Sequence, residues 1–71
     1  MDLNTLRRIE ALMYSGRGDG TAIELRQQLA ESHPLKEDVV RTIMEKRVSF
    51  DPYFDRGLDR AREDGLDLDT F

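Results

Sequence analysis

Apolar side chains recur at intervals of three or four residues in four separate stretches of this 71-residue chain. Such spacing places the side chains of each stretch on one face of an α-helix. The four sets are Leu6, Ile9 and Met13; Ala22, Leu25 and Leu29; Leu35, Val39 and Ile43; and Phe54, Leu58 and Ala61. The pattern therefore predicts an all-α fold, a small bundle of three to four short helices.

Glycine and proline divide the chain into its expected helices. We expect one helical domain over residues 1–71, with helices at about residues 2–14, 21–32, 34–47 and 52–64. Three glycines between residues 16 and 20 predict a flexible loop at 15–20, because glycine is costly inside a helix. Pro34 suits the first turn of the third helix. A tail at 66–71, in which apolar and acidic residues alternate, follows the last helix.

Capping patterns support these boundaries. Thr21 and Glu24 have the spacing of a capping box at the start of the second helix. Asp51-Pro52 predicts an N-cap followed by proline at the first position of the fourth helix. The residues before it, 48–50, are expected to form a short extended connection. Gly65 predicts a left-handed end to the fourth helix, with Leu66 close to Ala61.

The third helix has the broadest apolar face, because Val40 and Met44 form a second row beside its first set. We therefore expect this helix to be central. On the first helix, Arg7, Arg8 and Glu10 are expected to face solvent. The side chains expected to be mostly buried are Leu6, Ile9, Leu25, Leu29, Val39, Ile43, Phe54 and Leu58.

Composition excludes several classes of protein. The chain has no Cys and one His, so neither a disulfide framework nor a zinc module is predicted. No apolar run approaches the ~18–20 residues of a membrane span, and no signal peptide opens the chain, so we expect a cytoplasmic protein. No catalytic residue, metal site or cofactor is predicted. His33 stands beside Ser32, which gives no triad geometry, so the sequence does not predict an enzyme.

The segment Val48-Ser49-Phe50-Asp51-Pro52, followed by a helix, is similar to the Phe-Asp-Pro element near the end of HD-GYP phosphodiesterase domains. The similarity covers about a third of the chain. The metal-binding His and Asp residues of that family have no counterpart here. The similarity therefore implies no activity for this chain.

The excess negative charge is confined to the last third of the sequence. Residues 1–50 carry eight acidic and eight basic side chains, whereas residues 51–71 carry seven acidic side chains and three arginines. Four of the acids recur every four residues on the fourth helix and form an acidic row: Asp51, Asp55, Asp59 and Glu63. Such a row is typical of a solvated helix face, and it also suits docking to a basic surface.

The function that we expect is that of a small acidic regulator, of the inhibitor or adaptor type, that binds a protein partner. Small size, acidity and the lack of cofactor motifs are typical of stand-alone modulators, including those that phages and plasmids encode. The residues expected to contact the partner are Tyr53, Asp55, Asp59 and Glu63. An aromatic anchor flanked by charges is a common interface pattern.

Two alternatives remain at this point. The second and third helices could pack as a helix-turn-helix that binds DNA through Lys36, Arg41, Lys46 and Arg47. Glu37 and Asp38 at the start of the would-be recognition helix, and the net charge of −4, disfavour nucleic acid. The other alternative is a structural subunit that forms homo-oligomers, for which a homodimer is the simplest case.

Overall fold

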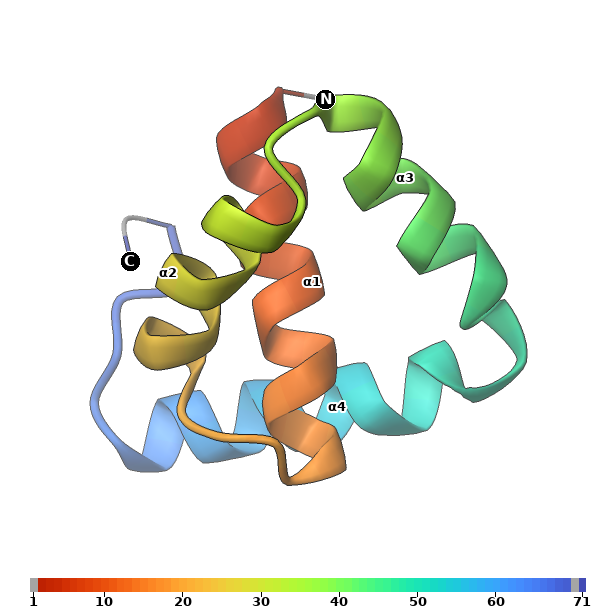
Figure 1. The fold of residues 1–71 in the computed structure, drawn as a ribbon. Coiled ribbons are helices and arrows are strands. Elements are labelled where there is room, and N and C mark those ends of the chain that lie inside the picture. Colours follow the sequence, from red (N-terminus) through yellow and green to blue (C-terminus); the bar gives the residue numbers. More distant parts are fainter. Residues whose placement is uncertain (1, 70) are drawn as a thin grey trace.

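The computed structural model describes residues 2–69 and 71, and for Val48 it describes the backbone but not the side chain. Four α-helices make up this part of the chain: α1 (Leu3–Arg17), α2 (Ala22–Ser32), α3 (Lys36–Glu45) and α4 (Arg47–Glu63). In Figure 1, α1 runs through the middle, between α2 and α3, and α4 crosses its C-terminal half. The predicted all-helical bundle is confirmed for the described residues.

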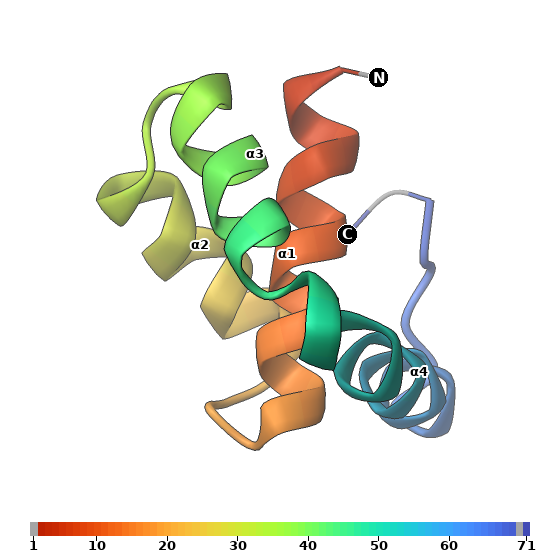
Figure 2. The same cartoon turned by 90° about the vertical axis from the view of Figure 1, so that its right-hand side faces the viewer.

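The central helix is α1, so the expectation that the third helix would be central is wrong. α1 packs against α2, α3 and α4. The three consecutive residues Ala11, Leu12 and Met13 are at most 4% exposed. Successive side chains of a helix point in directions about 100° apart, so a buried run of three requires neighbours on several sides. In Figure 2, α2 and α3 lie on one side of α1, and α4 lies beside its C-terminal half on the other side.

Only some of the side chains that were expected to be mostly buried are buried. Leu25 and Val39 are buried, whereas the other six expected core residues are half-buried. One core cluster consists of Leu12, Ala22 and Ala61, and the side chains packed against it are Phe54, Leu58, Leu66, Leu68 and Phe71. The tail that follows α4 therefore covers part of the core, although Thr70 lies outside the described residues.

The first helix ends three residues later than expected. Ser15 and Gly16 belong to α1, which ends at Arg17, so the loop begins at Gly18 rather than at residue 15. Gly18 adopts a left-handed φ of 96°, and its N–H donates to the Ser15 carbonyl. The N–H of Asp19 donates to the Tyr14 carbonyl at 3.2 Å, which completes a Schellman ending. One glycine of the three therefore ends the helix.

The fourth helix begins earlier than expected. α4 starts at Arg47, so the segment at 48–50 is helical rather than extended, and Asp51-Pro52 lies inside the helix rather than at its cap. Because proline has no backbone N–H, Pro52 removes one i→i−4 hydrogen bond from the second turn of α4. Because residues 47–50 are helical, Phe50 lies about one turn before Phe54 on the same helix, and their rings stack with centroids 5.2 Å apart. This aromatic contact favours the longer helix.

Two other expected helix ends are confirmed, at Thr21 and Gly65, and a further cap lies at Asp2, at the expected start of the first helix. Asp2 accepts a hydrogen bond from the N–H of Thr5 at 2.8 Å and caps α1. Thr21 accepts from the N–H of Glu24 at 3.3 Å and caps α2. Gly65 has a φ of 71°, and the N–H of Leu66 reaches the Ala61 carbonyl at 2.9 Å. Short-range patterns of this kind depend on a few neighbouring residues, so the sequence specifies them directly.

Candidate functional site

The acidic row of α4 lies on the outer side of the helix. Asp51, Asp55, Asp59 and Glu63 are all exposed. Within the described residues, the ion pair that involves the row joins Asp59 to Arg62, 3.7 Å apart on the same helix. Exposed pairs of this type contribute little to stability, typically 0–1 kcal/mol. The row therefore makes little contribution to holding the fold together.

The opposite side of α4 packs tightly on α1. A Cβ atom built on Gly57 would lie 1.8 Å from the Leu12 carbonyl oxygen, and one on Gly16 would lie 1.7 Å from the Tyr53 carbonyl oxygen. The two backbones are therefore in direct contact through both glycines. Tyr53, the expected aromatic anchor, is half-buried beside this contact. The sequence feature that could have predicted this close packing is a pair of small residues one turn apart, Gly57 and Ala61.

The basic residues expected for DNA binding lie on and after α3. Lys36, Arg41 and Arg47 are exposed, and Lys46 is half-buried. Arg41 pairs with Asp38 at 3.4 Å on the same helix. α2 and α3 pack mainly against α1 and share few contacts with each other. In a helix-turn-helix the two helices pack against one another as a unit, so this arrangement does not favour the DNA-binding alternative.

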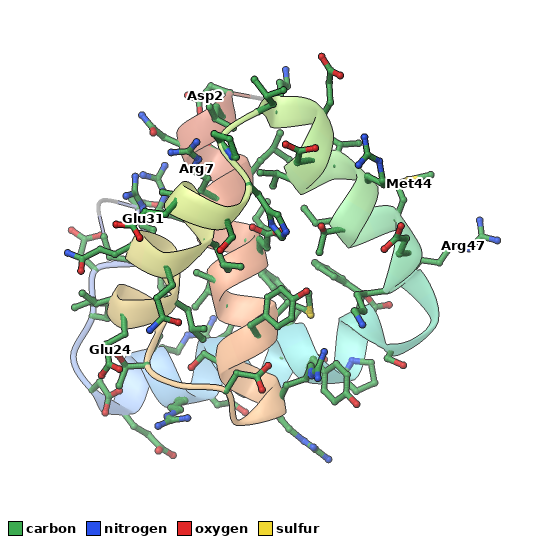
Figure 3. All side chains as sticks on the ribbon, in the orientation of Figure 1. Asp2, Arg7, Glu24, Glu31, Met44 and Arg47 are labelled. Atoms are coloured by element: carbon green, nitrogen blue, oxygen red, sulfur yellow. The ribbon has the colours of Figure 1, made fainter. Side chains whose placement is uncertain are left out.

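The outer side of α3 is apolar as well as charged. Val40 is 39% exposed and Met44 is 59% exposed, so the second row of the expected central helix faces solvent. Leu35, just before α3, is 57% exposed. A shallow hollow on this helix is lined by Lys36, Glu37, Val40 and Arg41. We call Glu37, Val40 and Met44 of α3, together with Arg47 at the start of α4, the outer row of α3. Figure 3 shows Met44 and Arg47 projecting from the same side of the molecule.

A buried carboxylate lies on the other side of α3. Glu10, which was expected to face solvent, is 0% exposed. Its Oε2 lies 3.1 Å from Nδ1 of His33, in the turn between α2 and α3, and its Oε1 has no hydrogen-bond partner. Arg7 reaches the same turn, where its Nη2 donates to the Pro34 carbonyl at 3.0 Å. These contacts connect α1 to the turn that sets the position of α3.

Burial changes the proton affinity of this carboxylate. Removal from water raises the pKa of Glu10 above its ordinary value of 4.5, and the charges of His33 and Arg7 offset part of the rise. Ser32, the hydroxyl adjacent to His33 in sequence, is exposed. The contact between Glu10 and His33 is therefore a structural one. The spacing of residues along the first helix did not predict it.

Comparisons with known proteins give no family for this chain. No protein-family model matches it, no curated protein matches it, and no solved structure matches it. Among residues 2–69 and 71, no group of three His, Asp or Glu side chains is placed to hold a metal ion. No helix in that part of the chain has both the length and the apolar character needed to cross a bilayer.

Proposed function

We propose that this chain is a small regulator that acts by binding another protein, with the acidic row of α4 as the contact surface for a basic partner. The observation that carries the proposal is the separation of roles on α4. The inner side packs against α1 through Gly57, whereas the outer side presents four exposed carboxylates. Carboxylates with little role in the fold are available to speed association with a positive surface.

A pair of charge variants tests this proposal. Asp55→Lys with Asp59→Lys should weaken capture of the partner at least about tenfold, because like charges would then face each other across the interface. The melting temperature should stay nearly unchanged, since both side chains are exposed. The matched control is Glu24→Lys with Glu31→Lys on α2, which makes the same change in net charge elsewhere (Figure 3).

The measurement starts with the tagged chain as bait in a lysate of the organism that encodes it, with mass spectrometry to identify the captured protein. The purified partner is then titrated against the three forms at low and at physiological salt. Equal affinity of the row variant and the control would contradict the proposal. A sequence-specific gel shift with the unmodified chain, lost in Arg41→Glu with Lys46→Glu, would favour the DNA-binding alternative.

A further inference from the structure

The outer row of α3 is complementary to itself when a second copy is turned antiparallel. Its three members on α3 are spaced by three and four positions, which is the heptad spacing of helix pairs, and Arg47 follows three positions later, after the turn at Lys46. The charge at one end of the row is negative, at Glu37, and at the other end it is positive, at Arg47. Both side chains are exposed, and the apolar Val40 and Met44 stand between them.

We propose that this face binds a second copy of the same chain, in a two-fold symmetric dimer with the two α3 helices antiparallel. A two-fold interface uses the same patch on both subunits, so each contact occurs twice. In the antiparallel register, Glu37 of each copy faces Arg47 of the other, and Val40 of each copy faces Met44 of the other. The dipoles of the two helices are then also opposed, which is favourable.

The shape of the face supports the same register. The hollow lined by Lys36, Glu37, Val40 and Arg41 lies one turn before Met44 on α3. In knobs-into-holes packing, each side chain inserts between four residues of the facing helix. Methionine is flexible and suits an irregular hollow. The Met44 side chain of each copy therefore has a receiving site on the other, while Arg41 remains paired with Asp38 beside it.

The area available predicts a weak dimer. α3 has 10 residues, and a contact limited to one short helix is smaller than a standard protein–protein interface. We expect a monomer–dimer equilibrium with a dissociation constant roughly between 10 µM and 1 mM. The proposal uses no part of the acidic row of α4, so Asp55→Lys with Asp59→Lys should leave the dimer constant within about threefold.

Sedimentation equilibrium of the full chain over this concentration range tests the dimer. Met44→Ser should raise the dissociation constant at least about tenfold, because it removes the central apolar contact twice. Ile23→Ser on α2 is the matched control, since Ile23 is 52% exposed, and it should change nothing. A chain that stays monomeric at about 1 mM, or equal effects of the two variants, would overturn the proposal.

A charge swap tests the register. Glu37→Arg alone and Arg47→Glu alone should each weaken self-association at least about tenfold, because each places like charges at both ends of the row. The double variant should recover the wild-type constant to within about threefold. A mixture of the two single variants should form a mixed dimer more readily than either forms its own. Absence of both kinds of rescue, with circular dichroism unchanged, would exclude this antiparallel pairing.

Discussion

α1 contacts its neighbours through two chemically different surfaces. Toward α4, Gly16 and Gly57 let the two backbones touch. Toward α3, the contact includes Glu10, a charged side chain that is 0% exposed and bonded to His33. The first surface depends on the absence of side-chain atoms, and the second on the presence of a polar group. The two surfaces should therefore respond differently to substitution and to pH.

The largest expected effect is at the glycine contact. Gly57→Ala should lower the free energy of unfolding by at least about 2 kcal/mol, measured by urea denaturation. A new Cβ 1.8 Å from the Leu12 carbonyl oxygen forces the helices apart at a cost of about 3 kcal/mol or more, while the better helix propensity of alanine returns only about 1 kcal/mol.

Gly18→Ala serves as the comparison for this substitution. A Cβ at Gly18 meets nothing within 4 Å, but its φ of 96° strains any other residue by about 1–2 kcal/mol. We expect Gly18→Ala to be the milder change, with the helix content of α1 retained. If the two variants were equally stable, the backbone contact between α1 and α4 would not be a major determinant of the fold.

A smaller effect, with a distinct pH dependence, is expected at the polar contact. The pKa of Glu10 is raised from 4.5 in the folded chain, so the folded state favours the protonated carboxyl. Its contribution to stability is therefore fully present below pH 4.5 and is lost as the pH rises through the raised value. Glu10→Gln cannot titrate and should not show this loss.

Urea denaturation of both forms at several pH values measures this difference. The stability of Glu10→Gln relative to the wild type should increase from pH 4.5 to pH 7.5. The groups that face Glu10 are His33 from the turn, Arg7 and Tyr14 from α1 and Thr42 from α3. A constant difference between the two forms across this range would show that burial does not raise the pKa of Glu10.

The smallest effect is expected in the loop after α1. Insertion of Gly-Ser after Asp19 should cost less than about 0.6 kcal/mol, because loop-closure entropy grows slowly with length. The same insertion between Ser15 and Gly16 should be far more harmful, since it displaces Gly16 from the Tyr53 backbone. Thermal melting followed by circular dichroism compares the two. Equal tolerance would mean that α1 does not need its last turn.

The surfaces proposed for binding differ in how far the sequence anticipated them. Recurrence every four residues predicted the acidic row, and its members are all exposed. The outer row of α3 was missed, because Val40 and Met44 were interpreted as an inner row of a central helix. Periodicity shows that an apolar stripe exists, but it does not say whether another helix covers it. α3 packs on α1 with its other side, through Val39, and so leaves this stripe uncovered.

Local chemistry in the sequence determined the helical class of the fold and several of its ends. The caps at Asp2, Thr21 and Gly65 involve residues no more than five positions apart, so the neighbouring residues in the sequence are enough to predict their hydrogen bonds. Tertiary structure alone decided which helix is central, why Gly16 belongs inside α1, and where α4 begins. It also decided the burial of Glu10. These features depend on contacts between residues distant in sequence, and close packing is a property of the assembled helices rather than of any one of them.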